Sequence, residues 1–166
     1  MSRIRDEYVD TGKVRFVYKN YAILGEQSVL SSMASECAAE EDKFWEYHDI
    51  IFADQAQNRS PLDEANLIRF AEEIGLDVSS FTDCLQSERY ANVVLQDAQA
   101  IQSLGVRGTP GFVVNGRYIS GAQPFSVFKQ TIDAELQAMA IPVEESAPEG
   151  QPVGAQEAGP PPPPDE

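Results

Sequence analysis

The chain has 166 residues, 42% of them hydrophobic, which suits one domain with a real hydrophobic core. Its formal net charge is −15, and an acidic body without a basic stripe argues against nucleic-acid binding, because phosphate contacts need Lys and Arg. No apolar run reaches the roughly 18 residues that a membrane helix needs, and no charged-then-apolar leader stands at the start, so we expect no membrane span and no export signal in this chain.

The first predicted elements are a helix end and a strand. Residues 1–9 have apolar positions at helical spacing, and Gly12 fits a C-terminal stop. The sequence VRFVYK at 14–19 alternates apolar and polar residues, with Val14, Phe16 and Tyr18 on one side. This alternation predicts a β-strand.

A long helical section follows from about 26 to 104. Apolar stripes predict helices over 28–40 and 43–54, and the second stripe includes Phe44, Trp45, His48, Ile51 and Phe52, which we expect to pack in the core. Three further helix starts are predicted from capping residues. They are Ser60 with Pro61, Asp77 and Ser87.

The pattern then changes to period two. The runs GFVV (111–114) and RYIS (117–120) flank Asn115-Gly116, which predicts a hairpin because both turn residues need a positive φ. Pro124 opens a last helix. Residues 142–166 hold six carboxylates and eight of the 11 prolines, so this tail is predicted to be disordered.

The order of elements predicts an α/β protein with a thioredoxin-like fold. Residues 1–141 form the predicted domain, with a helical insertion at about 26–104. The strand that normally comes first in this fold has no counterpart in the sequence.

Three segments carry a family resemblance: DKFWEYHDIIFADQ (42–55), FTDCL (81–85) and GVRGTPGFVVNGRYISGAQPF (105–125). They resemble the DsbA-like thiol–disulfide oxidoreductases over roughly residues 1–138. The resemblance implies that Pro110 is cis, and that Thr109 and Pro110 form a groove where the substrate chain pairs like an added strand. It also implies protein thiols and disulfides as substrates, and an extracytoplasmic location.

The same resemblance exposes a missing nucleophile. The family has a CxxC motif at the start of its first helix, where the helix dipole lowers the pKa of the attacking cysteine. No CxxC occurs here, because the two cysteines, Cys37 and Cys84, are far apart in the sequence. We therefore expect no disulfide exchange by this chain, which we interpret as truncated before and through that motif.

The lost strand would lie between 14–19 and 111–114. Its absence leaves three alternatives open: the two strands close up on each other, a partner chain fills the slot, or the chain is a fragment of a longer product.

For Cys37 and Cys84, the resemblance implies a structural disulfide, and the alternative is two buried free cysteines. His48 is the sole histidine, and packing is favoured over proton transfer because no nucleophile is near it in sequence. No Cys/His cluster has zinc-like spacing, so we expect neither a metal nor a cofactor.

The sequence thus supports a DsbA-like oxidoreductase that is inactive as written. The alternative is a non-catalytic thioredoxin-like module that binds peptides. A third and weaker hypothesis is a glutathione-binding isomerase of the same fold.

Overall fold

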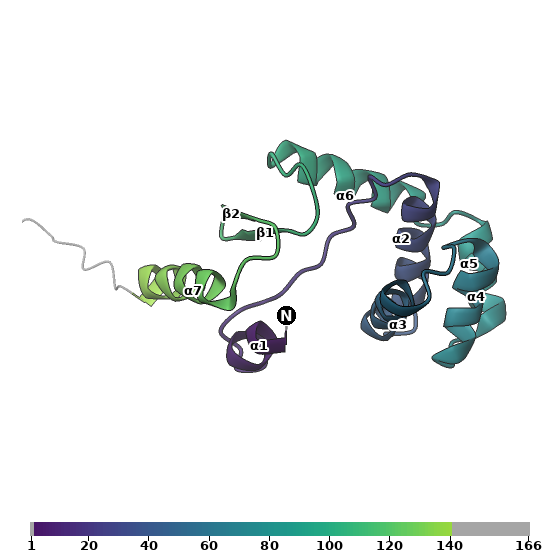
Figure 1. The fold of residues 1–166 in the computed structure, drawn as a ribbon, viewed down its shortest axis with the longest axis horizontal. Coiled ribbons are helices and arrows are strands. Elements are labelled where there is room, and N and C mark those ends of the chain that lie inside the picture. The colour runs from purple at the N-terminus through teal and green to yellow at the C-terminus, as the bar shows by residue number, and fades with distance from the viewer. Residues whose placement is uncertain (1, 141–166) are drawn as a thin grey trace, which may run out of the picture.

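The computed structural model describes residues 2–140, and its elements fall into two groups (Figure 1). The first group, here called the helical region, contains α2 (Glu26–Ala39), α3 (Phe44–Gln57), α4 (Glu64–Glu73), α5 (Val78–Gln86) and α6 (Ala91–Ser103). The second group, the hairpin region, contains α1 (Ser2–Ile4), the π-helix η1 (Arg5–Val9), β1 (Gly111–Val114), β2 (Arg117–Ser120) and α7 (Phe125–Ala140). In Figure 1, α2–α5 gather on one side, the hairpin and α7 lie on the other, and α6 reaches across between them.

The helical region has its own core. Every helix contributes to it, and the most deeply buried members include Tyr47, Leu67, Phe70, Phe81 and Leu85. The hydroxyl of Tyr47 donates to the carbonyl of Leu67 at 2.9 Å, so the one polar atom of this side chain is satisfied inside the core.

The hairpin region has a smaller core between the hairpin, α7 and the first helical turns. Ile4, Tyr8, Ile119, Phe128 and Ile132 are its buried members. The Tyr8 hydroxyl donates to Asp133 at 2.7 Å, which ties η1 to α7. The predicted helix at 1–9 is therefore present over the residues described.

The predicted hairpin is confirmed. β1 and β2 pair antiparallel with Val114 opposite Arg117, and the turn residues Asn115 and Gly116 have φ values of 46° and 90°. Both values lie in the left-handed region, which Asn and Gly adopt most readily. These are the only two strands among residues 2–140.

The strand predicted at 14–19 is not present as a paired strand. In Figure 1 the chain between η1 and α2 runs extended, and within the described residues no backbone hydrogen bond involves residues 15–19. A strand requires a neighbour, and no described segment lies beside this one in a ladder. The alternative in which 14–19 and 111–114 close up on each other is therefore wrong.

The predicted buried face of α3 is right for Ile51, which lies in the core, and wrong for Trp45 and Phe52. Tyr47, Ile51 and Asp54 are the buried residues of this helix, whereas Trp45 is 46% and Phe52 59% exposed. The helix carries apolar residues on both sides. Tyr47 reaches Leu67 of α4, whereas Phe44, Trp45 and His48 contact Phe16 and Tyr18.

Two of the three predicted helix starts are wrong. Asp77 does cap α5, because its side chain accepts from Ser80 N–H. Asp63, not Ser60, caps α4, and no side chain caps the start of α6 at Tyr90. Ser60 bonds to Asp54 and Ser87 to the carbonyl of Cys84, so both serines have other partners.

No helix among residues 2–140 has the length and apolar character needed to cross a membrane. The predicted boundary at 141 and the predicted disorder of 142–166 lie outside the described residues.

Candidate functional site

The loop that leads into β1 holds the two predicted groove residues. Thr109 and Pro110 are both exposed, and the peptide bond between them is cis, as the resemblance to the DsbA-like family implied. The carbonyl of Pro110 accepts from Gly121 N–H at 2.9 Å, which closes the hairpin at its open end. These two residues therefore stand at the surface, directly before β1.

The backbone directly after this loop is tightly packed. A Cβ atom placed on Gly111 would lie 2.8 Å from Val106 Cγ1 and 3.2 Å from Tyr118 Cε2, closer than side chains tolerate. Val106 is buried, and its carbonyl accepts from the Tyr21 hydroxyl at 3.1 Å. The loop is thus held in place by the extended segment, residues 13–25, to which Tyr21 belongs.

One edge of β1 has no partner among the described residues. β2 occupies the other edge, and in an antiparallel ladder the backbone groups of alternate residues point away from the partner strand. Because Val114 and Arg117 flank the turn as a hydrogen-bonded pair, the outward groups are those of Gly111 and Val113. Val113 and Tyr118, opposite each other on the outer face, are 43% and 40% exposed.

The extended segment is held against the helical region by aromatic rings. Tyr18 lies 5.2 Å from Phe44 and 5.4 Å from His48, and Phe16 lies 5.8 Å from Trp45, measured between ring centroids. Phe16 and Tyr18 share one side, so the predicted alternation is present even though the strand pairing is not. His48 packs in this cluster, and its Nδ1 lies 2.9 Å from Asp49 Oδ1.

Polar contacts hold the end of the same segment. Asp97 of α6 is buried and accepts from Lys19 Nζ at 2.7 Å and from Asn20 N–H at 3.1 Å. The Asn20 amide also donates to Glu36 at 2.5 Å. Burial raises the pKa of Glu36 above its usual value; the Asn20 hydrogen bond opposes this rise, and the nearby Asp97 carboxylate adds to it.

Cys37 and Cys84 form a disulfide that joins α2 to α5. The sulfur atoms are 1.99 Å apart, and both residues are almost completely buried. These are the two cysteines of the sequence, so the 166 residues contain no free thiol when this bond is formed. The neighbouring Glu40 accepts from Arg89 and Tyr90, and these bonds lower the pKa of its carboxyl.

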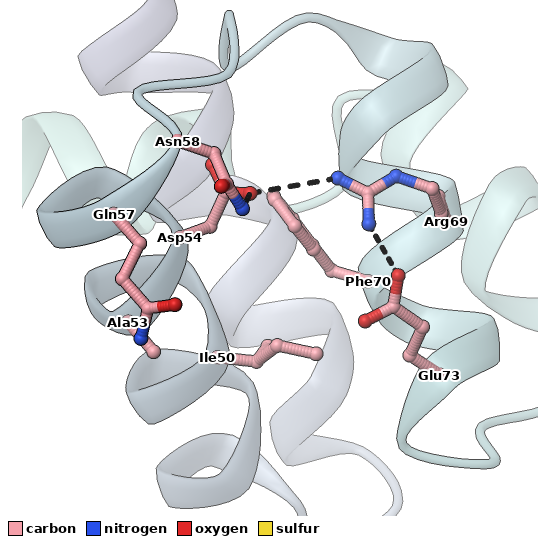
Figure 2. A pocket seen from close by; sticks show the side chains of 8 residues that line it. All are labelled: Ile50, Ala53, Asp54, Gln57, Asn58, Arg69, Phe70 and Glu73. Carbon is pink, nitrogen blue, oxygen red and sulfur yellow. Dashed lines mark hydrogen bonds and ion pairs between the residues drawn. The ribbon is translucent and has the colours of Figure 1, made fainter.

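A polar pocket lies between α3 and α4 (Figure 2). Its central group, Asp54, accepts from Asn58 and from both the N–H and the hydroxyl of Ser60. The Asn58 hydrogen bond is the largest influence that lowers the pKa of Asp54. Arg69 lies 3.8 Å from Asp54 and bonds to Glu73. Because these groups satisfy one another, the network serves to hold the α3–α4 loop.

The sequence analysis missed three contacts around the site: Asp97, Tyr21 and the aromatic cluster on α3. Asp97 had a detectable signal, since it stands on the apolar stripe of α6 between Val94 and Ile101 at helical spacing. The Tyr21 hydroxyl had none, because its partner is a backbone carbonyl 85 positions away.

The fold and the site define a thioredoxin-like α/β protein with a helical region inserted between its first helix and its hairpin. Residues 1–134 match a family model described as thioredoxin, and the chain belongs to that family. Within it the chain is DsbA-like, as its relatives and the solved structures below indicate.

Two relatives illustrate the sequence similarity. The chain is 32% identical over 142 residues to the probable disulfide bond formation protein D of Bacillus anthracis, which covers 82% of this chain and 64% of that protein. It is 35% identical over 126 residues to the Na(+)/H(+) antiporter NhaA 3 of Salinispora tropica, which covers 75% of this chain and 18% of that protein. The chain thus spans less than two thirds of the length of either relative.

Solved structures agree with the fold. The oxidised BdbD of Bacillus subtilis superposes with a TM-score of 0.74 at 26% identity, covering 82% of this chain and 76% of that one. A thioredoxin-like oxidoreductase from Silicibacter pomeroyi gives a TM-score of 0.67 at 26% identity, covering 82% and 77%.

Proposed function

We propose that this chain provides the polypeptide-binding part of a DsbA-like thiol–disulfide oxidoreductase. The exposed loop at Thr109 and Pro110, with its cis peptide bond directly before β1, is the observation that carries the proposal. An extended polypeptide that lies along this loop would pair with the loop's backbone, in the manner of strand addition.

The 166 residues do not themselves exchange disulfides. Exchange begins when a thiolate attacks a disulfide and ends when a second thiol resolves the mixed disulfide. Cys37 and Cys84 are bonded to each other and buried, so neither sulfur is placed to attack. We assign this pair a structural role, and an active enzyme needs a cysteine pair that these residues do not include.

The proposed location is outside the cytoplasm. Disulfides persist in oxidising compartments, and a buried disulfide that joins two helices of a core is a stabilising feature of proteins there. The substrates of the intact oxidoreductase in such a compartment would be protein thiols and disulfides.

A second candidate function is a non-catalytic module that holds a polypeptide strand permanently. The backbone of residues 15–19 favours it, because this segment is extended and has no backbone partner among the described residues. A strand supplied by another chain would fill the place beside it and beside β1.

An insulin reduction assay with dithiothreitol tests the catalytic part of the proposal. The chain should give no acceleration over dithiothreitol alone, and the double substitution Cys37→Ala/Cys84→Ala should change nothing. Acceleration that the double substitution abolishes would mean that this disulfide is the reactive pair, and would overturn the structural role.

A further inference from the structure

A pocket of about 320 Å³ lies beside the disulfide of the helical region, between the end of α2 and the start of α5. Cys37 lines this pocket although its side chain is only 3% exposed, whereas Cys84 does not line it. The other lining residues are Glu40, Glu41, Asp77, Ser80 and Phe81. A small molecule that enters the pocket therefore meets the disulfide at Cys37.

The lining of the pocket carries three carboxylates and no cation. Glu40 is paired with Arg89 at 2.7 Å, but Glu41 and Asp77 are exposed and form no ion pair within residues 2–140. Lys43, which follows Glu41 closely in the sequence, donates to two backbone carbonyls just after α4. The pocket that leads to Cys37 is therefore negatively charged.

Reduction of a disulfide by small thiols requires one anion to enter and another to leave. A thiolate RS⁻ forms a bond to Cys37 Sγ as the Sγ–Sγ bond breaks, and Cys84 leaves as a thiolate. A second thiolate then attacks the mixed disulfide, forms RS–SR and releases the Cys37 thiolate. Two electrons pass from the two thiols to the disulfide, and both cysteine thiolates take protons from water.

The carboxylates of the pocket oppose both charged steps. A thiolate on its way to Cys37 passes Glu41 and Asp77. Glu40 Oε1 lies 3.8 Å from Cys84 Sγ, so the leaving thiolate develops its charge beside a carboxylate whose repulsion Arg89 only partly offsets. A thiol with a further negative charge meets a larger repulsion on entry, and a thiol with an ammonium group meets a smaller one.

We propose that this pocket makes the reduction of the Cys37–Cys84 disulfide depend on the charge of the thiol. Small thiols that carry a cationic group react fastest, neutral ones more slowly, and thiols with additional negative groups slowest of all. The disulfide is thereby protected wherever anionic thiols are the reductants. This inference concerns the helical region and does not depend on the function proposed for Thr109 and Pro110.

The experiment reduces the 166-residue chain with cysteamine, 2-mercaptoethanol or 2-mercaptoethanesulfonate at equal thiolate concentration. Each rate is divided by the rate of the same thiol with oxidised N-acetylcysteine amide, a neutral disulfide, which removes differences in intrinsic reactivity. Alkylation with iodoacetamide and mass spectrometry measure the released thiols. Cysteamine should react about tenfold faster than the sulfonate, and about 1 M salt should lower this ratio to about twofold.

The double substitution Glu41→Gln/Asp77→Asn tests the assignment to the pocket. Gln keeps an acceptor for the Asp77 N–H, and Asn keeps a cap for α5. This variant should lower the ratio to about threefold or less. Glu26→Gln/Asp63→Asn is the matched control, because it removes the same charge at the starts of α2 and α4, and it should keep the tenfold ratio.

Three results would overturn the proposal. Equal normalised rates for the three thiols would exclude a charge effect, and an equal loss of the ratio in the control would assign the effect to net charge. A rate that levels off with thiol concentration would mean that reduction follows unfolding of the chain.

The site of the first attack gives an independent test. An early acid quench of the cysteamine reaction, followed by peptide mapping, should find the mixed disulfide on Cys37 and a free thiol on Cys84. The reverse distribution would overturn entry through this pocket, because Cys37 is the cysteine that lines it.

Discussion

The helical region and the hairpin region differ in what surrounds their polar backbone and their cores. In the helical region, five helices enclose one core, a disulfide crosses it, and a buried carboxylate, Asp54, secures a loop. In the hairpin region, two short strands and α7 enclose a few residues, and one edge of β1 is unpaired among the described residues. We therefore propose that the first region provides stability and the second the binding surface.

This division fits a general property of proteins, in which binding segments come from the less stable parts of the structure. The extended segment 13–25 joins the two regions, and side chains rather than backbone bonds hold it. Tyr18 packs on α3, Lys19 and Asn20 bond to Asp97, and Tyr21 bonds to Val106. Substitutions in each place test whether the two regions are as different as their contacts suggest.

The largest effect is expected from removal of the disulfide. For cysteines 47 positions apart, the chain-entropy relation gives a loss of about 4 kcal/mol in the free energy of unfolding for Cys37→Ala/Cys84→Ala. Urea denaturation followed by the fluorescence of Trp45, the sole tryptophan, measures it. Reducing agent should destabilise the parent chain by the same amount and leave the variant unchanged. A loss below about 1 kcal/mol would contradict a stabilising role for the disulfide.

Next in size is Asp97→Ala, which removes one of the contacts that hold the extended segment against the helical region. It leaves the buried Asn20 N–H without its acceptor and removes the partner of Lys19. We expect a loss of about 2–3 kcal/mol in the free energy of unfolding, because buried groups that lose a charged partner are costly.

The matched control for that change is Asp97→Asn, which keeps an acceptor for Asn20 and should lose clearly less. Hydrogen exchange at the Asn20 N–H, which Asp97 accepts, should be faster in the alanine variant. Unchanged exchange there would mean that the aromatic contacts alone fix the segment.

Gly111→Ala should have a smaller effect, confined to the hairpin region. The new methyl group would overlap Val106 and Tyr118, so we expect about 1–2 kcal/mol of overpacking. Gly108→Ala is the control, since a Cβ atom there meets nothing within 4 Å. If the two variants are equally stable, the loop before β1 is looser than its contacts indicate.

Local signals explain which parts of this structure the sequence could predict. The hairpin follows from Asn115 and Gly116 alone, because the turn needs residues that tolerate positive φ. The helices follow from apolar periodicity. The cis bond at Pro110 and the disulfide, in contrast, came from family resemblance, since nothing in their immediate sequence requires them.

The errors arise where a distant partner decides the outcome. Residues 14–19 have the alternation of a strand, but pairing depends on a neighbour that the described chain does not provide. α3 has two apolar faces, and the choice between them depends on where α2 and α4 lie and on the carbonyl of Leu67 that Tyr47 reaches. Periodicity describes one helix at a time and carries no information about such partners.

The smallest predicted effect concerns pH at the junction of the two regions. Because burial raises the pKa of Glu36 above its value of 4.5, the folded state binds this proton more tightly than the unfolded state. Stability is therefore greatest below that value and declines as pH rises through the raised pKa. Glu36→Gln should remove this decline, which urea titrations at half-unit steps from pH 4.5 to about 7 would detect.

Asp54 should affect the pH dependence of stability in the opposite direction to Glu36. Its pKa is lowered by hydrogen bonds to Asn58 and Ser60, so its contribution is present above its usual pKa of 3.8 and is lost as pH falls through the lowered value. Asp54→Asn should flatten the stability profile only on this acid side, and Glu36→Gln only above it. If Glu36→Gln leaves the slope above pH 4.5 unchanged, the carboxylate is as well solvated as in the unfolded chain, and the junction between the regions is open to water.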